Sequence, residues 1–135
     1  MSGDLSRHNL PRGWSLARWD DAKGEVQSVI WRQGLTGKPM TYKELSSQLE
    51  SERLFWRSPI LRALLDEIAL DVASEGGPWV TALVTRSGSP CPGAGFFITV
   101  PESEWLPAGK AAFCREQQQL AAQWIAERPE GKDRT

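Results

Sequence analysis

The sequence has few of the residues from which enzyme and metal sites are usually built. It contains one histidine, His8, and two cysteines, Cys91 and Cys114, which stand 23 positions apart. A zinc site needs a cluster of such ligands, and a Ser-His-Asp or Cys-His arrangement needs a base within hydrogen-bond reach of its nucleophile. We therefore expect no catalytic residue, no metal site and no cofactor, and a protein that is not an enzyme.

The sequence also lacks a disulfide framework and a long apolar run. Two cysteines are too few to staple a small secreted domain. The N-terminal residues have no signal-peptide pattern, and no segment approaches the roughly 18 consecutive apolar residues of a membrane helix. We expect reduced thiols, a cytoplasmic location and no membrane partner.

An excess of positive charge is absent as well. The formal net charge is −1 and the sequence pI is about 5.9. Nucleic-acid-binding domains usually present a basic field, so any contact with nucleic acid has to come from a local patch.

What the chain does have is enough apolar material for one domain. Its 135 residues are 40% hydrophobic and include seven tryptophans, which are spread over every segment. Most of these rings are expected to pack in the core, and one or two exposed ones would mark an interface. We predict a single domain over residues 14–128, between a flexible N-terminal arm (residues 1–13) and a charged tail (residues 129–135).

Helix signals are clear at several points. Apolar spacing predicts helices over residues 20–33 and 110–127. Thr41 and Glu44 have the spacing of a capping box, which starts a helix that ends near residue 50. Ser58 followed by Pro59 starts another, which ends at the glycines of residues 76–77.

Two strands and a loop are predicted after this last helix. Residues 79–85 are rich in β-branched side chains, and residues 95–100 form a matching run. The nine residues between them, 86–94, are rich in glycine, proline and serine, which indicates a loose hairpin. Because the glycines of residues 93–95 lead into a predicted strand, they do not match a phosphate-binding loop, which leads into a helix.

This order of elements is typical of a winged helix-turn-helix. We predict an α+β fold, mostly helical, with a two-stranded β-hairpin as the wing and a C-terminal helix. The fold class does not determine the function.

The charges are unevenly distributed along the central helices. Residues 38–62 contain five bases against three acids, whereas residues 63–75 contain four acids and no base. The start of the helix after Ser58 could therefore approach phosphates, while its acidic middle would repel DNA. The predicted nucleic-acid-binding residues are Lys38, Lys43, Arg53, Arg57 and Arg62 for phosphate, Tyr42 as a wedge, and Arg86 on the wing.

Three segments resemble a known family. Residues 41–45, Arg62 and residues 78–88 are similar to the winged-helix domain of alkylguanine-DNA alkyltransferases and alkyltransferase-like proteins. In that family a tyrosine and an arginine help to rotate a nucleotide out of the duplex, and the resemblance implies these roles for Tyr42 and Arg62. The family's Pro-Cys-His-Arg motif is absent, and Cys91 lies beyond the predicted strand, so alkyl transfer is not implied.

Residues 81–85 and 92–97 also resemble small uncharacterised bacterial and phage proteins with a helix-turn-helix-like core, which suggests a bacterial or phage origin. Two functions follow from these patterns. The first is a non-catalytic winged-helix protein that binds double-stranded DNA. The alternative is a protein-interaction module on the same scaffold, such as an inhibitor, immunity or adaptor protein, and the sequence leaves the oligomeric state open.

Overall fold

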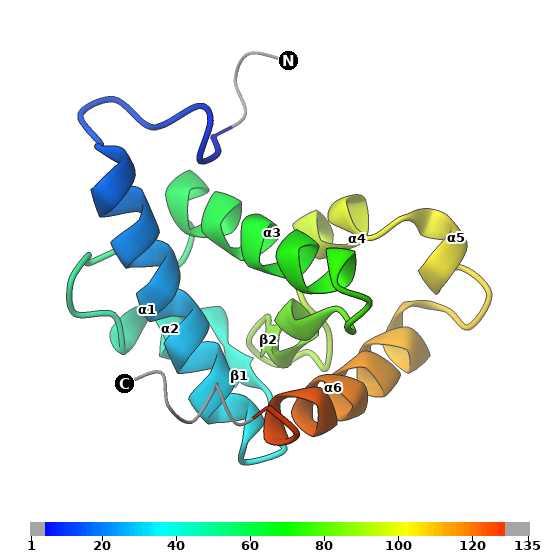
Figure 1. The fold of residues 1–135 in the computed structure, drawn as a ribbon. Coiled ribbons are helices and arrows are strands. Elements are labelled where there is room, and N and C mark those ends of the chain that lie inside the picture. Colours follow the sequence, from blue (N-terminus) through cyan, green and yellow to red (C-terminus); the bar gives the residue numbers. More distant parts are fainter. Residues whose placement is uncertain (1–4, 129–135) are drawn as a thin grey trace.

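A computed structural model describes residues 5–128 of the chain. Within this range it contains six α-helices, one 3-10 helix and two short strands (Figure 1). The elements are α1 (Leu16–Gly34), β1 (Met40–Thr41), α2 (Tyr42–Ser47), α3 (Pro59–Ser74), η1 (Val80–Leu83), β2 (Val84–Thr85), α4 (Ala94–Thr99), α5 (Glu102–Trp105) and α6 (Lys110–Ala126). The fold is therefore mixed helix and strand and mostly helical, as predicted.

The predicted helix starts at Thr41 and Ser58 are confirmed. The Thr41 Oγ1 atom accepts a hydrogen bond from the Glu44 amide (3.1 Å), and the Glu44 carboxylate accepts one from the Thr41 amide (2.8 Å). Ser58 accepts from the Ile60 amide (3.0 Å), with Pro59 at the first helical position. Both caps satisfy amides that a helix leaves free at its N-terminus.

Helix α1 is longer than the sequence pattern suggested. It begins at Leu16, four residues before the predicted start, because the Ser15 side chain accepts a hydrogen bond from the Arg18 amide. Helix α2 is shorter than expected and ends at Ser47. Helix α6, at Lys110–Ala126, agrees with its predicted range within one residue.

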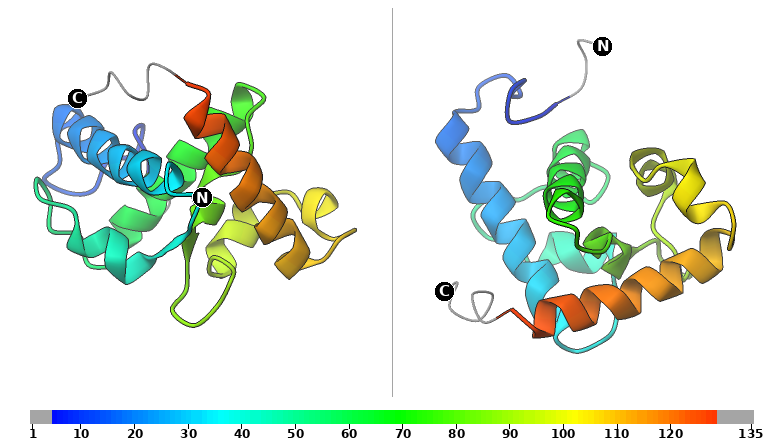
Figure 2. Two further views of the ribbon diagram at one scale, coloured as in Figure 1. Left: turned by 90° about the horizontal axis from the view of Figure 1, so that it is seen from below. Right: turned by 45° about the vertical axis from the view of Figure 1, so that its right-hand side comes forward.

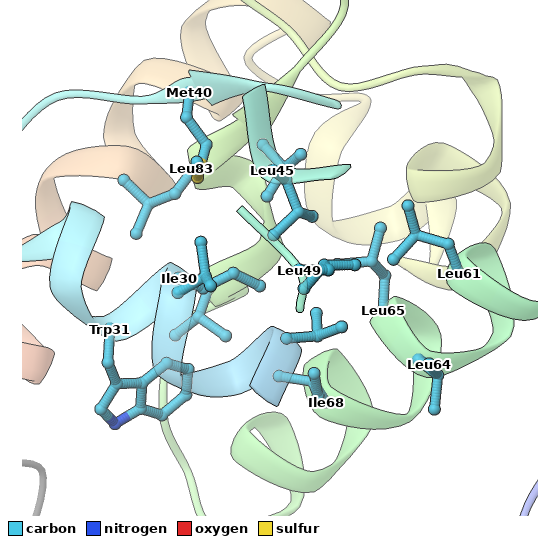
Figure 3. Packing of buried hydrophobic residues seen from close by; sticks show 14 of the residues in the cluster. Ile30, Trp31, Met40, Leu45, Leu49, Leu61, Leu64, Leu65, Ile68 and Leu83 are labelled. Carbon is cyan, nitrogen blue, oxygen red and sulfur yellow. The ribbon is translucent and has the colours of Figure 1, made fainter. Parts of the chain in front are cut away.

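The hydrophobic core lies where α1, α2 and α3 meet. Leucines of α2 and α3 converge on Ile30 of α1, while Met40 and Leu83 close the cluster (Figure 3). The C-terminal ends of α1 and α6 also meet (Figure 2, right). At that junction a Cβ atom on Gly34 would collide with the end of the Ile125 side chain, so the glycine allows the two helices to approach without displacing it. α4 and α5 lie on the side of α3 away from α1 (Figures 1 and 2).

The predicted β-hairpin is wrong. Of the residues expected in its first strand, 80–83 form the 3-10 helix η1, and only Val84 and Thr85 are extended. This strand pairs in parallel with β1, in the register Met40 with Val84 and Thr41 with Thr85. The second predicted strand is the helix α4. There is thus no antiparallel wing within residues 5–128, and the glycines of residues 93–95 lead into a helix.

The burial pattern explains why residues 94–99 are helical. Phe96 and Val100 are 7% and 1% exposed, whereas Ile98 is 74% exposed. In a strand the side chains of all three residues would lie on one face. In a helix Phe96 and Val100, which are four residues apart, lie on the same face, and Ile98 lies on a different one. Phe96 packs with Trp79 and Phe113 in a second hydrophobic cluster, so tertiary packing overrides the strand propensity of this aromatic run.

An ionic cluster joins α1 to α3. The Glu67 carboxylate accepts hydrogen bonds from the Trp19 indole (3.1 Å), from Lys23 (3.2 Å) and from the Arg7 amide (2.5 Å). Lys23 also contacts Asp71, at 2.7 Å. Two of the four acids of residues 63–75 therefore share one lysine of α1 as their partner.

Part of the predicted N-terminal arm takes part in these contacts. Leu5 and Leu10 pack against the main hydrophobic cluster, and the Arg7 guanidinium lies 3.1 Å from Asp20. Residues 5–13 therefore make specific contacts with the domain, whereas residues 1–4 and the predicted tail, 129–135, lie outside the described residues. Among the helices of residues 5–128, none is long and apolar enough to span a bilayer.

The Glu67 cluster predicts a stability change with pH. Partial burial would raise the pKa of Glu67, but the hydrogen bonds from Trp19, Arg7 and Lys23 outweigh it and lower the pKa. A carboxylate with a lowered pKa in the folded state stabilises the fold above its unfolded pKa of about 4.3 and loses that contribution as pH falls. We expect Glu67→Gln to reduce the free energy of unfolding at pH 7 by about 1–3 kcal/mol.

Urea unfolding at pH 7 and at successively lower pH measures this effect. The difference between wild type and Glu67→Gln should shrink below about pH 4, where the wild-type carboxylate itself becomes protonated. Glu75→Gln, at the exposed end of α3, is the control and should change stability by less than about 0.5 kcal/mol. An equal loss in both variants would contradict the role of the Glu67 cluster.

Candidate functional site

A pocket opens between α2, the start of α3 and the start of α4. Its volume is about 540 Å³, which is within the range of small-ligand pockets. The wall combines leucine and aromatic side chains with three arginines, one carboxylate and the main chain of a glycine-rich segment. These lining residues include Tyr42, Trp56, Leu61, Leu65 and Phe96, then Arg57, Arg62, Arg86 and Asp66, and residues 93–95.

The short parallel strand pair positions two of these residues. Thr41 is paired with Thr85, so the next residues, Tyr42 and Arg86, emerge together at the end of the two strands. Tyr42 then begins α2, and Arg86 begins the loop that leads to α4. Residues separated by more than 40 positions are thereby brought to the same wall of the pocket.

Tyr42 connects this wall to the segment before α4. Its hydroxyl oxygen accepts a hydrogen bond from the Gly93 amide at 2.9 Å. Burial of the ring raises the pKa of Tyr42, and the Asp66 carboxylate raises it further, while the Gly93 amide and the cationic charges of Arg62 and Arg86 lower it. The net pKa shift is upward, so the phenol is neutral at physiological pH and can hydrogen-bond inside the pocket.

Arg62 lies across the start of α4. A Cβ atom built on Gly95 would lie 2.6 Å from the Arg62 Nε atom, so the absence of a side chain at this position makes room for the guanidinium. One turn further along α3, Asp66 accepts a hydrogen bond from the Thr99 hydroxyl at 3.0 Å. Two residues of α3 therefore contact both ends of α4 and fix its position at the pocket.

The remaining rim comes from the segment between α2 and α3. Trp56 contacts two cations: the Arg57 guanidinium carbon is 5.0 Å and the Lys43 Nζ atom 5.1 Å from its ring centre. Both distances are typical of cation–π contacts. This arrangement adds the charge of Lys43 to the rim, although its side chain does not line the pocket.

Hydrogen bonds and an ion pair hold this segment, and with it Trp56 and Arg57, against α1. The Glu25 carboxylate accepts hydrogen bonds from the amides of Glu50 (2.7 Å) and Ser51 (3.1 Å). Partial burial would raise the pKa of Glu25, but these hydrogen bonds lower it. Arg18 of α1 forms an ion pair with Glu52, at 2.5 Å.

The structure thus brings together five of the seven residues that the sequence proposed. Tyr42, Arg57, Arg62 and Arg86 line the pocket, and Lys43 reaches its rim through Trp56. Lys38 and Arg53 are exposed but do not line it. The role expected for Arg86 on a wing is not supported, because the hairpin is absent, and Arg86 contributes to the pocket wall instead.

Sequence reasoning missed Trp56, Asp66 and Gly95. The segment around Trp56 has no periodicity that predicts its position, and Asp66 was counted among the four acids that would repel DNA. The only local signal that an aromatic ring here could be part of a site is the adjacent cation Arg57, because Lys43 lies 13 positions earlier in the sequence. The described residues contain no group of three histidine, cysteine or acidic side chains that could hold a metal ion.

The pocket geometry predicts an unusual titration of Tyr42. It is the only tyrosine in the chain, so tyrosinate absorbance near 295 nm reports on this hydroxyl alone. We expect half-titration above the ordinary value of about 10, and a downward shift in Asp66→Asn, because that variant removes a negative charge but can still accept from Thr99. Stability should fall as pH rises through the folded-state pKa, since a raised pKa favours the folded state only below it.

Arg62→Ala is the complementary variant and should shift the Tyr42 pKa upward, because it removes a positive charge. Circular dichroism recorded at the same pH values shows whether the chain is folded during the titration. A midpoint at the ordinary value in folded wild-type protein would contradict the burial of this hydroxyl.

No protein-family model, no curated protein and no solved structure matches the chain.

Proposed function

We propose that the chain is a non-catalytic nucleic-acid-binding protein that contacts DNA phosphates with the rim of the pocket and accepts an unpaired base inside it. The observation that carries this proposal is the convergence of three arginines on one apolar, aromatic pocket in a chain whose net charge is −1. Such a concentration of positive charge provides the local patch that phosphate binding needs.

The chemistry of the wall suits a nucleobase. Bases that leave a duplex or belong to single strands stack on aromatic rings and on arginine planes. Tyr42, Trp56 and Phe96 supply rings, and Leu61 and Leu65 supply apolar surface. Polar groups that could contact a base edge are present in the same pocket, namely the Tyr42 hydroxyl and the Asp66 carboxylate.

The acidic half of α3 does not oppose this proposal as strongly as charge counting suggests. Glu67 and Asp71 face α1, where Lys23 contacts both carboxylates, at 3.2 and 2.7 Å. The pocket contacts the start of the helix, where Arg57 and Arg62 lie. Two of the four acids of residues 63–75 thus face a lysine on a different side of α3 from the pocket, which supports DNA binding at its N-terminal end.

Salt-dependent duplex binding tests the phosphate contacts. With a fluorescently labelled duplex, anisotropy should give a binding constant whose logarithm falls linearly with the logarithm of the salt concentration. We expect the double variant Lys43→Ala/Arg57→Ala to reduce the steepness of that line by about 2, because each lost phosphate contact reduces it by about 1.

The control is Arg128→Ala, which makes a single charge change at the C-terminal end of α6. Arg128 stacks on Trp124, 3.6 Å from its ring centre, and neither residue lines the pocket. This variant should keep the wild-type slope. Absence of binding by folded wild-type protein at low salt would refute the proposal.

A duplex with one unpaired base tests the pocket itself. Because an unpaired base costs less to extrude, we expect wild-type protein to bind this duplex about tenfold more tightly than a matched one, a difference of about 1.4 kcal/mol. Gly95→Ala should remove the preference without changing the salt slope, since the new Cβ displaces the Arg62 guanidinium but retains its charge. Alanine also has a higher helix propensity than glycine, so α4 should still form.

A protein-interaction module is the second candidate. It is favoured by two exposed apolar side chains, Ile98 on α4 and Leu106 at the end of α5, which are 74% and 59% exposed. If this function holds, Ile98→Asp should abolish association with a purified protein partner and leave the anisotropy results unchanged. The reverse pattern, with loss only in the pocket variants, would support nucleic-acid binding.

A further inference from the structure

The loop between β2 and α4, which contributes to the pocket wall, contacts α6 near a pair of cysteines. Cys91 lies in this loop, between β2 and α4, and its Sγ atom is 3.7 Å from the Lys110 carbonyl oxygen at the start of α6. Cys114 is one helical turn further along α6. An α-helix pairs each amide with the carbonyl four residues before it, so the Lys110 carbonyl that the Cys91 thiol contacts is also the partner of the Cys114 amide. Residues 23 positions apart in the sequence therefore become neighbours in the fold.

The surrounding hydrogen bonds fix Cys91 at this place. Its carbonyl oxygen accepts from the Arg86 amide at 3.0 Å, and its amide donates to the Ser89 side chain at 3.1 Å. The side chain of Gln118, on α6, donates to the Pro90 carbonyl at 2.9 Å. The loop is thus held against the same helix that carries Cys114, through Lys110 before this cysteine and Gln118 after it.

The two thiols differ in their access to solvent. Cys91 is half-buried, whereas Cys114 is fully buried. Burial raises the pKa of Cys114, and the neighbouring Cys91 raises it further. A small oxidant can therefore reach Cys91 first, and Cys114 is protected from direct attack.

We propose that Cys91 and Cys114 are an oxidation site at which a peroxide converts the dithiol into an intramolecular disulfide. The Cys91 thiol releases its proton, and the thiolate attacks one peroxide oxygen. The O–O bond breaks and Cys91 becomes a sulfenic acid, while the other oxygen leaves as hydroxide and takes up the released proton to give water. The Cys114 sulfur then attacks the Cys91 sulfur, an S–S bond forms, and the sulfenic oxygen leaves as a second water with the Cys114 proton. Two thiols lose two electrons in total, and hydrogen peroxide gains them.

Oxidation at this site would act on the pocket, an effect that rests on the function proposed above. The cysteine loop begins at Arg86 and ends at Gly93, whose amide donates to Tyr42. A disulfide holds two sulfurs about 2 Å apart, closer than two unbonded thiols can lie, so the disulfide draws the loop toward α6. The positions of Arg86 and of the Gly93 amide relative to Tyr42 then depend on the redox state.

The chemical step is tested with the 135-residue chain, reduced, desalted and treated with a few equivalents of hydrogen peroxide. Intact mass should fall by about 2 Da, the mass of two hydrogen atoms. Trypsin separates the cysteines because it cleaves after Lys110, so a non-reducing digest should contain residues 87–110 joined to residues 111–115. Dithiothreitol should restore both peptides and the original mass.

Two serine variants establish the order of events. Cys114→Ser should gain one oxygen at Cys91 and become reactive toward a sulfenic-acid probe, whereas Cys91→Ser should leave Cys114 unmodified. The disulfide should also raise the melting temperature of wild-type protein by about 5 °C, because it closes a loop of the unfolded chain without displacing distant parts of the fold. A sulfinic acid at Cys91 beside a free Cys114, only intermolecular disulfides, or a lower melting temperature would overturn the inference.

Duplex binding by the reduced and oxidised forms measures the link to the pocket. We expect the preference for an unpaired base to change at least threefold on oxidation and to return with dithiothreitol, while Cys114→Ser shows no reversible change. An equal preference in both forms would overturn the link, although the mass result would still establish the oxidation site. If neither form binds DNA but the disulfide forms, the proposed function fails and the oxidation site stands.

Discussion

The structure depends on the complete burial of the segment from Trp79 to Thr85. All seven residues of this run are buried, between α6 on one side and α1 and α3 on the other. A buried segment must find partners for its backbone amides and carbonyls, because an unpaired group in the interior is costly. Here they come from the 3-10 turn, from the pairing with β1, and from two glutamine side chains of α6. Gln117 accepts from the Trp79 amide at 2.8 Å, and Gln118 donates to the Ala82 carbonyl at 2.9 Å.

The same constraint builds the pocket. The two extended residues of β2 pair with the two residues of β1 and so fix the register of the strands. The chain then leaves the interior at Arg86, opposite Tyr42, because these are the next residues of the two strands. The loop must then return, and it does so through Gly93, which donates to Tyr42, and through Gly95, which leaves space for Arg62. The pocket is therefore a consequence of how the buried segment emerges, and its charged rim comes from three separate parts of the chain.

How far the sequence predicts this structure depends on whether each signal is local. Thr41 with Glu44, and Ser58 with Pro59, mark helix starts through hydrogen bonds within four residues, and both were predicted correctly. The run from residue 79 to residue 85 was not, since β-branched residues suit an interior 3-10 turn as well as a strand, and only the packing partners decide. Phe96 and Ile98 likewise fit a strand until the second hydrophobic cluster is known. For the site, charge and resemblance were enough to select Tyr42, Arg57, Arg62 and Arg86 as candidates. That they line one pocket depends on the β1–β2 register, which no local sequence pattern reveals.

The distribution of charge on α3 follows from the same packing. Arg62 and Asp66 are one turn apart and face α4, while Glu67 and Asp71, also one turn apart, face Lys23 of α1. A rotation of about 100° separates adjacent helix positions, which is enough to direct Asp66 and Glu67 to different neighbours. Acidic residues that appear as one cluster in sequence therefore serve two separate interfaces. The net charge of the helix says little about the field at the pocket, because the arginines at its N-terminal end are opposed there by the single carboxylate of Asp66.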